Sequence, residues 1–157
     1  MNIKLLVVGK TLKGFINDGV EEYTKRLKHY TNFSIEVIAD VKNSASLSKQ
    51  ELQKQEAILI EKHINSDDCV IILDEHGKQY KSTEFAHILQ QKMNTSIKSL
   101  VFVVGGAYGF AQNIKAKYSN KISLSSMTFS HQMVRLFFVE QLYRAFTILN
   151  NEPYHNE

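Results

Sequence analysis

The sequence predicts an α/β domain with a mostly parallel sheet and helices on both faces of that sheet. Short apolar runs alternate along the chain with longer segments of helical periodicity, and such alternation favours parallel strands. Strands that are apolar throughout are typical of a sheet covered on both sides. The chain has 157 residues, of which 43% are hydrophobic and 22% charged, which fits an ordinary globular protein. We therefore expect residues 1–157 to form a single domain.

The expected strands are short runs in which apolar residues dominate. Residues 34–39 alternate apolar and polar side chains, and the other runs are mainly apolar. In chain order the expected strands are residues 3–8, 34–39, 69–73, 100–104 and 122–124. Glycines follow two of them, Gly9 after the first and Gly105-Gly106 after the fourth, and predict turns there.

The expected helices lie between these strands and place apolar residues at helical spacing. They cover residues 15–30, 48–64, 82–93, 111–118 and a last segment from 130 or 131 to about 149. Ser48 and Glu51 have the spacing of a capping box, in which each side chain bonds an otherwise free backbone amide, so a helix begins there. The last helix is strongly apolar. Four polar residues interrupt its surface and suggest a partner subunit or a lined site: Arg135, Glu140, Gln141 and Arg144.

Composition and charge narrow the class of protein. The single cysteine, Cys69, excludes an internal disulfide and a multi-cysteine zinc site, and we expect no metal. No apolar stretch approaches the ~20 residues of a membrane span, so we expect no membrane partner and a reducing, cytoplasmic setting. Residues 79–157 hold 8 Lys/Arg against 4 Asp/Glu, whereas residues 1–78 hold 11 against 12. This basic half is compatible with a polyanionic partner and equally with an ordinary solvated surface.

Three loops after strands are the expected location of the chemistry, because ligands of parallel α/β sheets lie beyond the carboxyl ends of the strands. The loops are 74–77, 105–109 and 124–129. Gly105-Gly106-x-x-Gly109 matches neither the dinucleotide nor the phosphate-loop fingerprint, and alone it fits a tight turn equally well. Taken alone, Asp74-Glu75-His76 favours a turn.

The last helix and the tail also have ordinary readings. By position alone, His131 is a residue near a helix cap, and Glu140 with Arg144 is a helix-stabilising pair. The tail ends Pro153-Tyr154-His155, and a terminal segment of this kind usually frays. Proline nevertheless restricts the residue before it, so the ring and the imidazole could be presented at a defined angle.

Taken together, these segments resemble one known family, the ribosomal RNA large subunit methyltransferase H (RlmH) family of the SPOUT class. The order, spacing and chain length agree from Met1 to the tail. The segments that carry the resemblance are Leu73-Asp74-Glu75-x-Gly77, Phe102-Val103-Val104-Gly105-Gly106-x-x-Gly109, Leu124-Ser125-x-Met127-Thr128-Phe129-x-His131-x-x-x-Arg135, Glu140-Gln141-x-Tyr143-Arg144-Ala145 and Pro153-Tyr154-His155.

The resemblance implies a fold and a reaction that periodicity alone does not indicate. The fold would be of the SPOUT type, with a C-terminal trefoil knot that forms the cofactor pocket. The reaction would transfer a methyl group from S-adenosylmethionine to N3 of a pseudouridine in helix 69 of 23S ribosomal RNA, within the assembled ribosome. The family forms homodimers with active sites at the subunit interface, which would explain the apolar last helix.

The resemblance also assigns residues. Eight positions match the family's cofactor-binding positions: Leu73, Gly105, Leu124, Ser125, Ser126, Met127, Thr128 and Phe129. Four match positions associated with the target base or the RNA backbone: His131, Arg144, Tyr154 and His155. We expect His155 or His131 to remove the N3 proton, because a histidine pKa near neutrality suits a general base. Arg144 would steady a phosphate or the developing uracil anion, and Tyr154 would stack on a flipped base.

Other functions stay open at this point. A SPOUT methyltransferase that acts on tRNA or another RNA would have the same pocket. A non-catalytic ribosome-binding or assembly factor could keep the same fold. A nucleotide-binding α/β protein is a third reading, and the missing phosphate-loop chemistry argues against it.

Overall fold

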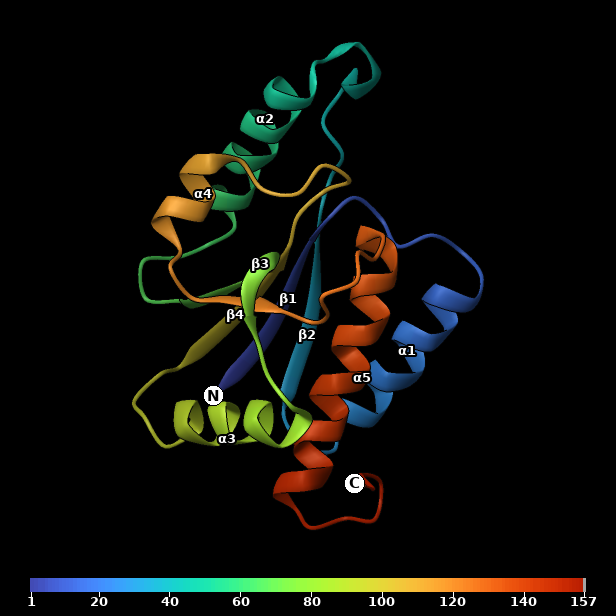
Figure 1. Ribbon diagram of the computed structural model, residues 1–157, viewed down its shortest axis with the longest axis vertical. Helices are drawn as coiled ribbons and strands as arrows, with labels where there is room; N and C mark the ends of the chain where they lie inside the picture. Colours follow the sequence, from blue (N-terminus) through green and yellow to red (C-terminus); the bar gives the residue numbers. More distant parts are fainter. Residues whose placement is uncertain (157) are drawn as a thin grey trace.

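The computed structural model describes residues 1–156 and places one sheet between two layers of helices (Figure 1). In these residues the strands pair in the order β2-β1-β4-β3-β5, and every pairing is parallel. The strands are β1 (Asn2–Val8), β2 (Asn32–Ile38), β3 (Cys69–Gln79), β4 (Ser99–Val104) and β5 (Lys121–Ser123). The helices are α1 (Phe15–Leu27), the 3-10 turn η1 (Ser44–Ser46), α2 (Lys49–Lys62), α3 (Ser82–Met93), α4 (Gln112–Lys117) and α5 (His131–Leu149). The predicted fold class is confirmed.

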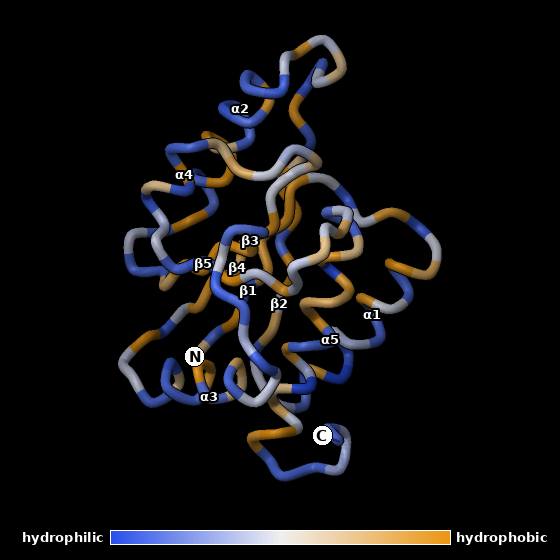
Figure 2. The backbone as a smooth tube through the Cα atoms, viewed as in Figure 1, coloured by the Kyte–Doolittle hydropathy of each residue, from blue (hydrophilic) through white to orange (hydrophobic). Residues whose placement is uncertain are grey.

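The central strands β1 and β4 are apolar because both of their faces are covered. Successive side chains of a strand point to opposite faces. Leu5 therefore packs with the helices α1, α3 and α5, whereas its neighbour Leu6 packs with α2 and α4. Figure 2 shows apolar colouring along the strands, whereas hydrophilic and apolar colours alternate along the helices. Two apolar cores result, one on each side of the sheet.

Helix boundaries follow the local capping signals. The capping box of α2 is formed, since Ser48 Oγ accepts a hydrogen bond from the Glu51 amide at 3.2 Å and Glu51 Oε2 accepts one from the Ser48 amide at 2.9 Å. Helix α5 begins at His131, after the N-cap Ser130. Helix α1 ends at Leu27 rather than near residue 30, because the following amides bond in tighter turns, such as Tyr30 N to Leu27 O at 3.0 Å.

The expectation that β3 ends at Leu73 is wrong. The strand continues to Gln79 after a bulge, and both Leu73 and Lys78 pair with Ile122 of β5. Residues 73–78 thus arch around Ile122. Gly77 permits this close approach, since a Cβ at that position would lie 2.6 Å from the carbonyl carbon of Ile122. The trefoil knot implied by the resemblance stays a prediction, as does the division of the chain into one domain.

Arg135 corrects a second expectation. It does not interrupt the outer surface of α5, because it is only 1% exposed. Its guanidinium donates hydrogen bonds to Val8 O at 2.6 Å, to Gly9 O at 2.9 Å and to Thr11 Oγ1 at 3.1 Å. Burial lowers the pKa of Arg135 to about 10, so it remains a cation at neutral pH. The side chain therefore fastens the start of α5 to the loop after β1.

Gln132 strengthens the same attachment. Its Oε1 accepts a hydrogen bond from the Leu12 amide at 3.0 Å, and its Nε2 donates one to Lys10 O at 3.2 Å. In the part of the chain that the structure describes, no helix is long and apolar enough to cross a membrane.

Replacing Arg135 should destabilise the fold strongly. Arg135→Ala leaves two buried carbonyl oxygens without donors and opens a cavity, so we expect the free energy of unfolding to fall by about 3 kcal/mol. Urea denaturation followed by circular dichroism measures the change. Lys25→Ala, at an exposed position of α1, is the control and should leave the transition midpoint unchanged. A midpoint for Arg135→Ala equal to that of the control would contradict this assignment.

Candidate active site

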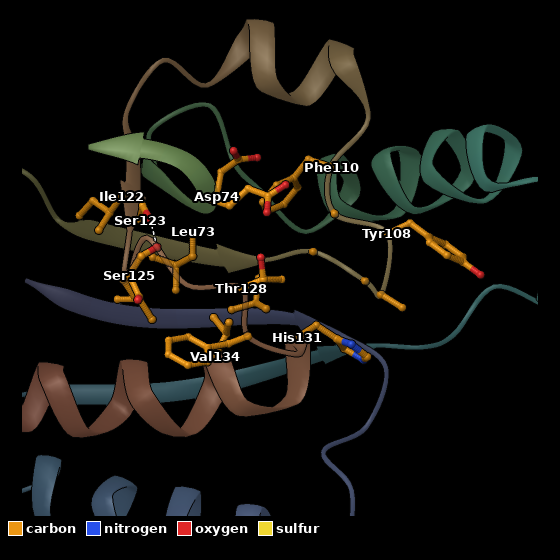
Figure 3. Close-up of a pocket in the computed structure, with 18 of the residues that line it drawn as sticks. Leu73, Asp74, Tyr108, Phe110, Ile122, Ser123, Ser125, Thr128, His131 and Val134 are labelled. Atoms are coloured by element: carbon orange, nitrogen blue, oxygen red, sulfur yellow. Dashed lines mark hydrogen bonds between the residues drawn. The ribbon is translucent and has the colours of Figure 1, made fainter. Parts of the chain in front are cut away.

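A cavity of about 320 Å³ lies beside the bulge of β3 and beyond the ends of β4 and β5 (Figure 3). This volume is in the range of small-molecule sites, roughly 300–1,000 Å³. Residues from all three loops that the sequence singled out line it. The floor is apolar and buried, formed by Leu73, Val104 and Ile122. Met127 and Phe129 also line the cavity and are 74% and 37% exposed.

The glycine-rich loop forms one wall of the cavity. It is a tight turn, in which the Gly109 amide donates to Gly106 O at 3.0 Å, and Gly109 has a φ of +71° that favours glycine. A Cβ at Gly105 would lie 3.2 Å from the carbonyl carbon of Gly109 and 3.3 Å from the Phe110 ring. The glycine motif therefore forms a tight turn and also lines the cavity, so its geometry is compatible with both interpretations.

The buried Asp74 and the half-buried Lys115 form an ion pair in the wall of the cavity. Asp74 Oδ2 lies 3.0 Å from Lys115 Nζ, and Asp74 Oδ1 accepts a hydrogen bond from the His76 amide at 2.9 Å. The bond from the His76 amide closes the turn that the sequence predicts at these residues, and this turn lies inside the bulge of β3. The ion pair fastens α4 to that bulge. No local pattern predicts this ion pair, because the two residues are 41 positions apart in the chain.

The third loop is shaped by two local hydrogen bonds. Ser123 Oγ donates to Ser125 O at 2.8 Å, the bond drawn in Figure 3, and Ser125 Oγ accepts from the Met127 amide at 2.9 Å. Seven of the eight predicted cofactor residues line the cavity: Leu73, Gly105, Leu124, Ser125, Met127, Thr128 and Phe129. Within residues 1–156, Ser126 is not part of that lining. Lys49 and Lys115 line it as well, and the sequence analysis did not single them out.

His131 is the one predicted base-contacting residue that lines the cavity in this chain, among the residues described. It stands at the first position of α5. Burial lowers the pKa of His131, and the nearby positive charge of Arg135 lowers it further, against an opposing effect of Asp40. A histidine in this state is neutral at physiological pH and can accept a proton.

The other three predicted residues lie at the far end of α5 (Figure 1). His131 and Arg144 are 13 positions apart in one helix, which corresponds to roughly 20 Å along its axis. The Arg144 guanidinium lies 4.7 Å from the centre of the Tyr154 ring, and its Nη1 lies 3.4 Å from His155 Nδ1. The structure therefore gathers Arg144, Tyr154 and His155 in one place, away from the cavity of the same chain.

The expectation of a frayed tail is wrong for the described residues. Tyr154 packs edge-on against Tyr143 with ring centres 4.8 Å apart, and its hydroxyl lies 3.1 Å from that of Tyr23. It also donates to Glu140 Oε1 at 3.1 Å. Burial and these two partners raise the pKa of Tyr154, so its phenol stays protonated at neutral pH.

The comparisons with known proteins agree on one family. The family model described as "Predicted SPOUT methyltransferase" matches residues 1–155. The chain is 54% identical to a protein of Flavobacterium psychrophilum and 52% identical to one of Parabacteroides distasonis, in each case over all 157 residues and the full length of the relative. Both relatives are named ribosomal RNA large subunit methyltransferase H.

The chain belongs to the SPOUT methyltransferase family. The resemblance to the RlmH family is confirmed by these full-length relatives. Solved structures agree on the fold. A probable methylase family protein of Haemophilus influenzae has a TM-score of 0.55 at 15% identity, covering 99% of this chain and 71% of that one. A putative RNA methyltransferase of Bacillus anthracis has a TM-score of 0.54 at 13% identity, covering 99% of both chains.

SPOUT methyltransferases use S-adenosylmethionine, and this chain is a methyltransferase dependent on it. The cavity fits that cofactor in its chemistry. Its apolar floor suits an adenine ring, and its glycine loop leaves room for the backbone to approach a ligand closely. Hydroxyl groups of Ser125 and Thr128 are among the polar groups of the lining. Among residues 1–156, no group of three or more His, Cys, Asp or Glu side chains could hold a metal ion.

Proposed function

We propose that this SPOUT methyltransferase methylates N3 of a pseudouridine in helix 69 of 23S ribosomal RNA, in the cytoplasm and on the assembled ribosome. The observation that carries the proposal is the 54% identity, over both full lengths, with a relative named ribosomal RNA large subunit methyltransferase H. The motif segments that resemble the RlmH family span the pocket, α5 and the tail, so the similarity includes the residues on which the reaction would depend.

The proposed cofactor site is the cavity itself. Leu73 and Leu124 would contact the adenine, Gly105 would leave space for the ribose and methionine portions, and Ser125 to Phe129 would close the remaining side. Ser126 belongs to this segment without lining the cavity, so its proposed contribution is through the backbone of the loop. The cofactor supplies a methyl group already activated for transfer.

The proposed working unit is a homodimer. One chain carries His131 at the pocket and Arg144, Tyr154 and His155 at the other end of a rigid helix, so a single chain does not bring them together. A two-fold dimer lets the tail of one chain reach the pocket of its partner. Apolar side chains near the pocket support such a contact, since Phe129 and Phe137 are 37% and 36% exposed and their rings lie 4.7 Å apart.

In the proposed mechanism the protein mainly positions the reactants and removes one proton. Displacement at an activated methyl carbon gains most from proximity and alignment. The N3 proton of the base must leave, and the neutral imidazole of His131 would accept it, or the His155 side chain would do so instead. Arg144 would stabilise the resulting uracil anion. Tyr154 keeps its proton and would therefore stack on the base rather than act as a base itself.

The small net charge of the chain supports the assembled ribosome, rather than naked RNA, as the substrate. A net charge of +3 over 157 residues gives a limited grip on phosphates. Binding to naked RNA should therefore be weak and sensitive to salt, because it depends on a few lysine and arginine contacts. A preassembled ribosome offers a shape to recognise as well as charge.

The decisive experiment identifies the methylated nucleotide. Ribosomes that lack the modification are incubated with the protein and S-adenosylmethionine carrying a labelled methyl group, and the labelled nucleotide is mapped by nuclease digestion and mass spectrometry. We expect label on one pseudouridine of helix 69 and much less on protein-free ribosomal RNA. Label on tRNA would favour a SPOUT methyltransferase that acts on tRNA. No label on any RNA would favour a non-catalytic ribosome-binding factor.

The composite site is tested by complementation between two inactive variants. Gly105→Val blocks the pocket, and a Tyr154→Ala/His155→Ala variant removes the tail groups. When equal amounts of the two chains are co-expressed, half of the dimers are mixed, and one of the two sites in each mixed dimer is intact. Methylation should recover to about a quarter of the wild-type rate. No recovery in verified mixed dimers would show that each site is built from one chain.

The identity of the base is tested by single-turnover rates at saturating cofactor. At least one of His131→Ala and His155→Ala should lower the rate about 100-fold, the usual scale of general-base catalysis, whereas His87→Ala on the exposed side of α3 should not. If His131 is the base, the wild-type rate falls on acidification only below about pH 6.5, because burial lowers the pKa of His131 from the ordinary histidine value. Wild-type rates in both variants would eliminate histidine general-base catalysis.

A further inference from the structure

Helix α2 holds the glycine-rich loop of the pocket through one polar stripe. Lys49, Gln53 and Glu56 are spaced i, i+4 and i+7, so they share a face of the helix. Lys49 Nζ lies 5.8 Å from the centre of the Tyr108 ring, and Gln53 Nε2 donates a hydrogen bond to Tyr108 O at 2.7 Å. The Glu56 carboxylate lies directly against the backbone of Gly106, whose amide favours the charged form of the carboxylate. Three consecutive positions of the stripe thus contact one loop.

Glu56 is the unusual member of the stripe because it is buried. It is 7% exposed, while the neighbouring Lys54 and Gln55 are exposed. A Cβ at Gly106 would overlap its Oε1, so the carboxyl group lies directly against the loop backbone. Burial raises the pKa of Glu56, and the negative charge of Asp40 adds to that effect although the Gly106 amide opposes it. A buried carboxylate is costly to a fold, and such groups concentrate at functional sites.

The contact fixes the orientation of one peptide group in the pocket wall. In a trans peptide the amide hydrogen and the preceding carbonyl oxygen point in opposite directions, and the described residues contain no cis peptide bond. Because the Gly106 amide points at Glu56, the carbonyl oxygen of Gly105 points away from α2. Gly105 lines the cavity and Glu56 does not. The glycine can therefore offer this oxygen to a ligand as an acceptor of fixed direction.

We propose that Glu56, assisted by Gln53, is a positioning residue that orients the Gly105–Gly106 peptide for S-adenosylmethionine and so sets the affinity for the cofactor. The proposal rests on the assignment of the cavity as the cofactor site. It gives α2, which precedes the first of the motif segments in the sequence, a part in cofactor binding.

The test compares two variants of nearly equal size by titration calorimetry with S-adenosylmethionine. Glu56→Met fills the space but leaves the Gly106 amide without its carboxylate, so the Kd should rise about tenfold, the scale of one hydrogen bond to a charged group. Glu56→Gln keeps an acceptor oxygen and should restore the Kd to within about threefold of wild type. Gln55→Ala, one position away on the exposed side, is the control and should bind as the wild type does.

Comparing stability with affinity in the same variants separates a positioning role of Glu56 from a purely structural one. Replacing a buried charge by an apolar side chain of similar volume is often neutral or stabilising. We therefore expect Glu56→Met to keep or raise the melting temperature while it weakens binding, and to raise the KM for the cofactor more than it lowers kcat. Wild-type affinity in Glu56→Met, or equal weakening in Glu56→Met and Glu56→Gln, would overturn the proposal.

Two further variants keep the result interpretable. If Glu56→Met does not fold, Gln53→Ala removes the second contact of the stripe, and we expect a Kd about threefold higher, on the scale of a neutral hydrogen bond. An unchanged Kd there would overturn the proposal. Gly105→Val tests the pocket itself. If the wild type does not bind the cofactor, or Gly105→Val binds it normally, the assignment of the cavity fails, independently of Glu56.

Discussion

The pocket depends on one close backbone contact, between the bulge of β3 and the strand β5. β5 is an edge strand that pairs with β3, and the bulge around Ile122 decides where residues 124–129 leave the sheet. The contact requires the missing side chain of Gly77, because a Cβ there would meet the Ile122 backbone. Leu73 before the bulge and Leu124 after β5 line the same cavity in consequence. The loop geometry is thus a result of strand pairing rather than of the loop sequence.

Helix α5 connects the pocket at its first turn to the tail at its last turns. Its first turn lines the pocket through His131 and Val134, and the buried Arg135 ties that turn to the end of β1. Its last turns meet Tyr23 of α1 and the tail. A straight helix of 19 residues cannot bring its two ends to one small molecule. The separation of the motif residues is therefore built into the fold, and it is the structural reason why a dimer is the simplest way to use all of them.

Most of the fold could be predicted from the sequence, because apolar periodicity and the Ser48–Glu51 capping box are local signals. The convergence of the loops at 105–109 and 124–129 followed from the general geometry of parallel sheets. The failures share a different cause. The length of β3, the docked tail and the burial of Arg135 depend on partners far along the chain, namely Ile122, Tyr23 and the carbonyl of Val8. Periodicity carries no information about such pairs. Glu56 was missed for the same reason, since one buried carboxylate in a polar helix has no signature of its own.

The charged groups near the pocket act on one another as well as on the backbone. Asp40 lies against Gly9, where a Cβ would meet its carboxylate at 2.5 Å, and its negative charge raises the pKa of Glu56, of Arg135 and of His131. Arg135 opposes it at His131. Burial is the largest effect on that imidazole and favours the neutral form. Arg135, which fastens α5 to β1, therefore also lowers the proton affinity of the histidine at the pocket, although less than burial does. Structural attachment and the capacity to accept a proton are properties of the same few side chains, so a substitution at Arg135 would alter both.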